Sequence, residues 1–123
     1  MPKFWLAGAT EDEGNGLDRS AEWQRSGVWK LMWDAGDKPV YDGRLARIEV
    51  GDRIAIKSMC GQGKSTIKIK AIGIIKEVSI EGRLVVVDWK LTNMSRIVPS
   101  KGCYGTLHGP FERDMWTRRV FSL

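Results

Sequence analysis

The chain has 123 residues, of which 42% are hydrophobic and six are tryptophan, and this composition excludes a disordered polypeptide because such chains are poor in aromatic residues. Its length predicts a single domain over residues 1–123, and no segment approaches the ~18 uninterrupted apolar residues of a membrane span. Two cysteines and one histidine are too few for a disulfide framework or a zinc quartet, and the acidic segment TEDEG at 10–14 argues against a secretory leader, so we expect a cytoplasmic protein without a cofactor.

Charge divides the chain into two parts. Acidic side chains outnumber basic ones in residues 1–43, whereas basic side chains predominate in residues 44–123 and give a formal net charge of +5. A basic surface attracts polyanions such as nucleic acids, although a modest net charge also keeps many proteins in solution. The composition therefore allows a nucleic-acid partner without requiring one.

The chain begins with a strand and a helix on either side of a polar loop. The apolar run KFWLAGA at 3–9 predicts a central strand, and the acidic, glycine-bearing segment at 10–20 predicts a loop. Residues 20–26 predict a short helix, which Ser20 caps and Gly27 ends.

A second strand is expected at 28–33, with the sequence VWKLMW. Because alternate residues of a strand point to the same side, Trp29, Leu31 and Trp33 share one face. The segment that follows, at 34–43, is rich in glycine, proline and aspartate and predicts turns.

Further strands are expected at 52–58, 65–78 and 84–91, which alternate in polarity or are rich in β-branched residues. The alternation places Lys57 on an outward face, and an apolar stretch around Gly73 predicts a β-bulge. A tight turn is expected at 80–83, and a short helix or a final strand near the C-terminus. The pattern predicts a mostly β (α+β) fold: a small β-barrel or curled sheet of five or six strands with two or three short helices.

The GKS sequence at 63–65 resembles the end of a phosphate-binding P-loop. That motif requires a first glycine at position 58, where Ser58 stands, and a helix after the loop, where TIKIKAIGII alternates like a strand. We therefore expect the tip of a β-hairpin and no nucleotide hydrolysis.

No other catalytic pattern is present in the sequence. His108 has no partner residues that would mark it as a base, and the acidic loops, including Asp34 and Asp37, lack the spacing of metal ligands. We expect a protein that is not an enzyme and that binds no metal.

Tryptophan is the strongest signal in the sequence. We expect Trp5, Trp89 and Trp116 to lie in the core. Trp23, Trp29 and Trp33 are instead grouped in a polar, loop-rich region beside Asp34. Two aromatic planes can enclose a flipped-out base while a carboxylate binds its edge, which makes this group a candidate base-binding site.

The order of these motifs resembles the EVE-like and YTH-like branch of the PUA-like superfamily, as found in modification-dependent restriction proteins. The resemblance covers nearly the whole chain and rests on the following segments: KFWLAGA, GVWKLMWD, EVGDRIAIKS, IKIKAIGIIKEV, LVVVDWK and GTLHGPF. It implies a PUA-like barrel that recognises a methylated or hydroxymethylated base by flipping it into an aromatic cage.

The resemblance also implies a set of site residues. Trp29 and Trp33 correspond to cage tryptophans, and Trp23 or Tyr41 has to supply the second aromatic wall because residues 76–83 contain none. The family contacts the base edge with the residues that follow its first strand, although the Lys-Ser pair of YTH members is absent here. The base-binding residues expected are Trp29, Trp33, Trp23, Tyr41, Asp34, Gly8, Ala9 and Thr10.

Basic residues complete the expected interface. If nucleic acid is bound, they would contact phosphates and supply affinity, while the pocket selects the base. Alternating lysines are equally typical of a solvated sheet face. The phosphate-binding residues expected are Lys57, Lys64, Lys68, Lys70, Arg96, Lys101, Arg118 and Arg119.

The sequence thus favours a module that binds nucleic acid, DNA rather than RNA, with no membrane partner and with an attached or associated NTPase or nuclease subunit. Two alternatives remain open: an RNA-binding PUA-like or ASCH-like domain, and an adaptor that docks protein partners.

Overall fold

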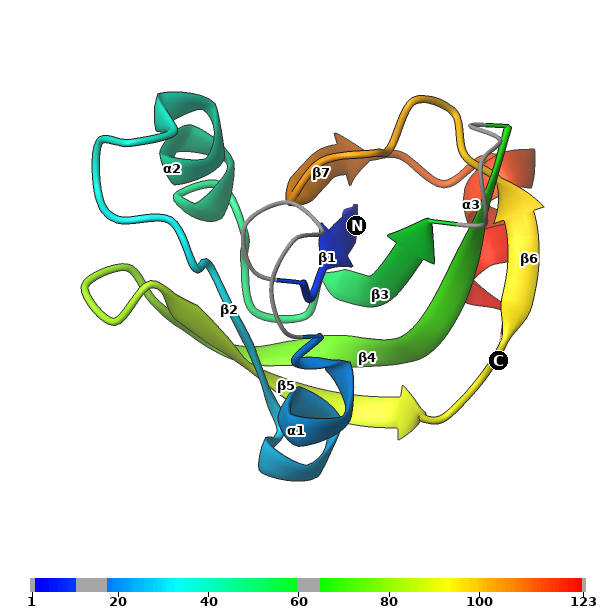
Figure 1. The fold of residues 1–123 in the computed structure, drawn as a ribbon, viewed down its shortest axis with the longest axis horizontal. Coiled ribbons are helices and arrows are strands. Elements are labelled where there is room, and N and C mark those ends of the chain that lie inside the picture. Colours follow the sequence, from blue (N-terminus) through cyan, green and yellow to red (C-terminus); the bar gives the residue numbers. More distant parts are fainter. Residues whose placement is uncertain (1, 11–17, 60–64, 123) are drawn as a thin grey trace.

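The structure is a computed structural model that describes residues 2–10, 18–59 and 65–122. These residues form a curled mixed sheet with three short helices around it (Figure 1). The strands are β1 (Phe4–Gly8), β2 (Val28–Lys30), β3 (Arg53–Met59), β4 (Thr66–Ser79), β5 (Leu84–Leu91), β6 (Arg96–Pro99) and β7 (Leu107–Phe111). The helices are α1 (Ser20–Ser26), α2 (Pro39–Leu45) and α3 (Met115–Phe121).

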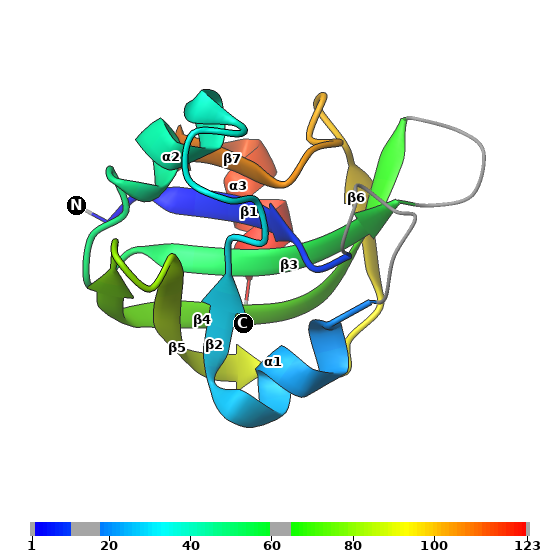
Figure 2. The same ribbon diagram turned by 60° about the vertical axis from the view of Figure 1, so that its left-hand side comes forward.

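Six strands form a half-barrel in the order β2-β5-β4-β3-β1-β7, and β6 pairs with β4 outside this path. All pairs are antiparallel except β1 and β3, which run side by side in the same direction (Figure 2). The long strand β4 curls so that one end pairs with β6 and the other with β5. The expected α+β fold with a curled, mostly β sheet is confirmed.

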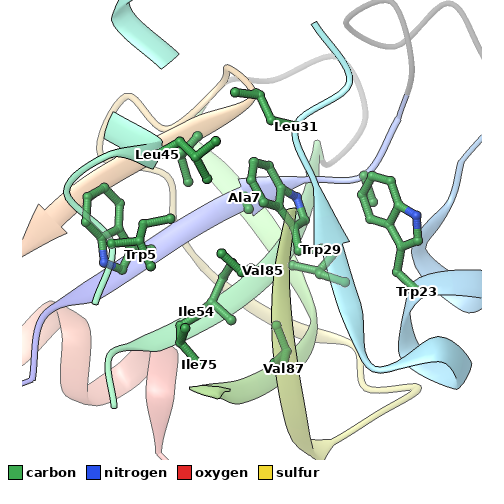
Figure 3. Close-up of a cluster of buried hydrophobic side chains, with 14 of the residues drawn as sticks. Trp5, Ala7, Trp23, Trp29, Leu31, Leu45, Ile54, Ile75, Val85 and Val87 are labelled. Carbon is green, nitrogen blue, oxygen red and sulfur yellow. The ribbon is translucent and has the colours of Figure 1, made fainter. Parts of the chain in front are cut away.

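The central strands β1 and β3 are buried on both faces of the sheet over most of their length. Its concave face encloses a cluster that includes Trp5, Trp29 and Ile54 (Figure 3). Its other face is covered by α3, whose Val120 and Phe121 pack with Leu6 and Ala55. Strands β1 and β3 are therefore apolar on both sides over most of their length, as is typical of central strands.

Two expected backbone features are confirmed. Gly27 ends α1 in the left-handed region, with φ of 70°. The pairing of β4 with β5 shifts register at Gly73, where a Cβ would lie 2.8 Å from the backbone oxygen of Asp88. The glycine lets the two strands approach at the point where β4 bends.

Other element predictions need correction. Helix α2 occupies residues expected to form turns; Pro39 stands in its first turn, where a missing N–H costs nothing. Strand β2 is three residues long, and Arg19 rather than Ser20 is the N-cap residue of α1. The C-terminal region contains both a strand and a helix.

The tip of the β3–β4 hairpin, residues 60–64, lies outside the described residues, as does most of the 10–20 loop. After Ser65 the chain continues as strand β4 and not as the helix of a P-loop. None of the helices that the structure describes is long and apolar enough to cross a membrane.

Candidate functional site

A pocket of ≈ 270 Å³ lies where the parallel strands β1 and β3 end. The carboxyl ends of these two neighbouring strands meet at the same edge of the sheet, where Gly8 is paired with Lys57. The segment between β6 and β7 closes a third side. The lining residues are Gly8, Thr10, Lys57, Ser58, Met59, Tyr104, Gly105 and Thr106.

Lys57 is the most unusual residue of this pocket. It is only 5% exposed and makes no hydrogen bond or ion pair with any residue that the structure describes. Burial lowers its pKa to about 8, although the nearby Cys103 acts in the opposite direction. Its Nζ atom lies 3.7 Å from the point where a Cβ on Gly8 would stand.

The prediction that Lys57 points outward with Lys68 and Lys70 is wrong. Cross-strand partners project to the same side of a sheet, and Lys57 is paired with Ile69, which belongs to the cluster beneath α3. Lys68 is paired with Ser58 and lies on the opposite face. Alternation alone could not show this, because it does not reveal that both faces of β3 are covered.

The described groups that interact with Lys57, His108 and Cys103, carry no negative charge at neutral pH. Burial raises the pKa of the Cys103 thiol. Burial, together with the positive charges of Lys57 and Arg44, lowers the pKa of His108 to about 4, so the imidazole is neutral. The His108 Nε2 atom accepts a hydrogen bond of 2.8 Å from the backbone N–H of Gly105, which makes His108 a support for the pocket wall.

The prediction that Trp29 walls an open cavity is also wrong. Its side chain is 0% exposed, and Figure 3 shows the indole inside the half-barrel, near Ala7 and Val85. Its N–H donates to the carbonyl oxygen of Gly8 at 2.8 Å. Trp23 is buried against Trp29 in an edge-to-face contact. Neither indole offers a free face to a ligand, because β2 directs Trp29 into the core and α1 covers it with Trp23.

Two other aromatic residues hold the wall of the pocket from behind. The indole N–H of Trp33 donates to the hydroxyl of Thr106 at 3.0 Å, and the backbone N–H of Thr106 donates to the hydroxyl of Tyr41 at 3.1 Å. Tyr41 is buried, whereas Trp33 is half-buried with the ammonium of Lys38 over its ring at 4.7 Å. Both residues are close to the pocket, but they position it and do not line it.

Only some of the residues expected to contact the base edge line the pocket. Gly8 and Thr10 line the pocket, whereas Ala9 is buried and the exposed Asp34 does not line it. The backbone N–H of Gly8 donates to the carbonyl oxygen of Thr106 at 2.8 Å, so it is not available to a ligand.

Tyr104 is an aromatic residue of the pocket that the sequence interpretation missed. It lies in the β6–β7 connection and is 41% exposed, and its hydroxyl accepts a hydrogen bond of 3.0 Å from Ser100. The signal that could have revealed it is the sequence GCYG, in which an aromatic residue stands next to glycines in a loop.

The other expected phosphate-binding residues are dispersed. Lys70 forms an ion pair with Asp18 at 2.7 Å, and Arg96 donates to backbone oxygens at the end of α3. Lys101 lies over the ring of Trp116, two residues before Cys103 and close to the pocket wall. Arg118 and Arg119 are exposed on α3, and Lys64 lies outside the described residues.

Within 2–10, 18–59 and 65–122 no three histidine, cysteine or acidic residues converge on a point that could hold a metal ion. The sequence matches no protein-family model and no curated protein. Function therefore has to be inferred from the fold and the pocket.

Proposed function

We propose that this chain is a nucleic-acid-binding domain that accepts one base, flipped from DNA, in the pocket at the ends of β1 and β3. The base would be methylated or hydroxymethylated, and the domain would be the recognition module of a modification-dependent restriction system. The observation that carries the proposal is the pocket itself: an exposed tyrosine ring beside a small cavity with polar side chains, in a basic chain.

The size and lining of the pocket support a base as its occupant. A cavity of ≈ 270 Å³ lies just below the usual range of about 300–1,000 Å³ for ligand pockets, which suits one planar ring better than a larger ligand. Tyr104 supplies an aromatic face for stacking, and the hydroxyls of Thr10, Ser58 and Thr106 supply groups that both donate and accept hydrogen bonds. This combination is typical of sites that hold a flipped base.

Extrusion of a base from a duplex costs a few kcal/mol. Stacking on one aromatic ring returns about 1–3 kcal/mol, and the remainder has to come from hydrogen bonds in the pocket and from phosphate contacts. Such contacts would come from Lys101, which interacts with Cys103, and from Lys68, the cross-strand partner of Ser58. The proposed roles therefore pair a stacking tyrosine with a basic rim.

The proposal is tested by fluorescence anisotropy on duplexes that differ at one position, which holds cytosine, 5-methylcytosine, 5-hydroxymethylcytosine or an abasic site. We expect wild-type protein to bind the modified duplexes more tightly than the abasic one. Tyr104→Ala should weaken binding to the modified duplexes by roughly 5- to 150-fold, the equivalent of one lost stacking contact. Tyr104→Phe should retain most of the affinity, because it keeps the ring.

Met115→Ala is the matched control, since Met115 is an exposed hydrophobic residue on α3 that does not line the pocket. Equal affinity of the wild-type protein for all four duplexes, or equal affinity of Tyr104→Ala and wild type for a modified duplex, would refute the proposed site.

A further inference from the structure

We infer that the pocket selects bases that carry a ring carbonyl oxygen, and that Lys57 is the residue that binds this oxygen. The inference rests on the proposed function and specifies which class of base the site accepts. It would place derivatives of cytosine, thymine, uracil and guanine among the ligands and exclude derivatives of adenine.

The first step is the state of Lys57 in the unliganded pocket. The side chain is 5% exposed, and no described residue accepts a hydrogen bond from it or forms an ion pair with it. The described groups that interact with it are the neutral imidazole of His108 and the thiol of Cys103. An ammonium that is largely removed from water and has no acceptor among the described residues carries a desolvation cost, and a ligand that brings an acceptor to it recovers part of that cost.

The ammonium of Lys57 points toward the cavity. Lys57 lines the cavity, and its Nζ lies beside Gly8, whose missing side chain leaves the ammonium open to the pocket. A Cβ at Gly8 would stand 3.7 Å from that atom and 3.5 Å from the carbonyl oxygen of Gly105. The ammonium therefore faces the space that a base would occupy.

The third step is the chemistry of the base edges. A lysine ammonium has three donors and no acceptor. Guanine, thymine, uracil and cytosine each present an exocyclic carbonyl oxygen, which accepts from such a donor. Adenine has none; it presents an exocyclic amino group beside its N7 acceptor, and a lysine cannot accept from that group.

The neighbouring hydroxyls complete the selection. The Thr106 hydroxyl oxygen already accepts from Trp33, so its own proton is available to donate. Thr10 and Ser58 can donate or accept. These groups adapt to the remainder of different bases, whereas the ammonium favours one feature at the inner edge, a carbonyl oxygen, over the ring nitrogen and amino group of adenine.

The oxygen could also come from a phosphate, and the test distinguishes the two sources. Duplexes identical except at one position carry 5-methylcytosine, 5-hydroxymethylcytosine, uracil, N6-methyladenine or an abasic site. The abasic duplex keeps the phosphates and lacks only the base, and a further arm adds inorganic phosphate as a competitor at constant ionic strength.

We expect wild-type protein to bind the three carbonyl-bearing bases about tenfold more tightly than N6-methyladenine or the abasic site, as for one good base contact. Lys57→Met keeps the length of the side chain and removes the charge, so this preference should fall to within about twofold while affinity for the abasic duplex is retained. Lys68→Met, the control on the adjacent strand, should weaken binding to all duplexes alike and leave the preference intact.

The outcomes separate the two proposals. A wild-type preference for N6-methyladenine, or an unchanged carbonyl preference in a folded Lys57→Met protein, overturns the role of Lys57 while base capture stands. Displacement of every duplex by inorganic phosphate from the wild-type protein but not from Lys57→Met shows that Lys57 binds phosphate and also overturns its role toward the base. No difference between any base and the abasic site overturns both proposals, and this result requires only the wild-type protein.

Discussion

Replacement of Trp29 with alanine distinguishes a core tryptophan from one that binds a ligand. The side chain is 0% exposed and packs against Trp23, so its removal leaves a cavity that lowers the free energy of unfolding by about 3–5 kcal/mol. Its N–H also donates to Gly8, and the loss of that bond adds about 1 kcal/mol. Because domains are stable by only ~5–15 kcal/mol, we expect Trp29→Ala to be largely or partly unfolded.

The assay is urea denaturation followed by far-UV circular dichroism, since fluorescence would change with the loss of an indole. Trp29→Phe keeps most of the packing and removes the N–H, so it should lose about 1–2 kcal/mol. Met115→Ala, at a position 84% exposed, should remain within ±0.5 kcal/mol of wild type. The reasoning is refuted if Trp29→Ala loses less than about 1 kcal/mol and at the same time no longer distinguishes modified from unmodified DNA, because Trp29 would then contact the ligand.

Three further predictions concern the backbone, the pocket and a buried carboxylate. Gly73→Ala should lower the melting temperature, since its Cβ would lie 2.8 Å from a backbone oxygen of β5. Gly43 lies in α2 with open space around it, so Gly43→Ala should raise the free energy of unfolding by about 0.5–1 kcal/mol. Affinity for a carbonyl-bearing base should decrease as the pH rises through about 8, because Lys57 loses its proton there. The neighbouring His108 has a pKa of about 4 and does not titrate between pH 6.5 and 9.5, so an affinity that stays constant over this range would contradict the prediction. Asp52→Ala should lower the free energy of unfolding by about 2–4 kcal/mol in chemical denaturation, because the buried N–H of Trp5 loses its 2.9 Å acceptor; a loss below 1 kcal/mol would show that water replaces the carboxylate.

The strands could be predicted from sequence wherever the pattern is local. Strand β5 is a run of β-branched residues, and the irregularity at Gly73 follows from an interrupted alternation. Helix α2 could not be predicted in the same way, because Pro39 and Gly43 are as typical of turns as of a short helix whose stability comes from packing.

The residues expected to form a site lie near the pocket, but the aromatic ones among them do not line it. Trp29, Trp33 and Tyr41 all bond to residues of the pocket, yet they contact its outer side. A sequence shows that an aromatic residue is present but not which way its ring points. Lys57 is buried near Cys103 and the segment between β6 and β7. That segment is distant from Lys57 in the sequence, so a local pattern cannot reveal the burial.

The bonds from Trp33 and Tyr41 to Thr106 have a consequence for the divergence of such proteins. Substitutions in residues 33–45 can displace one side of the pocket without any change in the residues that line it. On the proposed function, the ligand preference depends in part on this peripheral segment, and a comparison confined to the lining positions would not detect its effect.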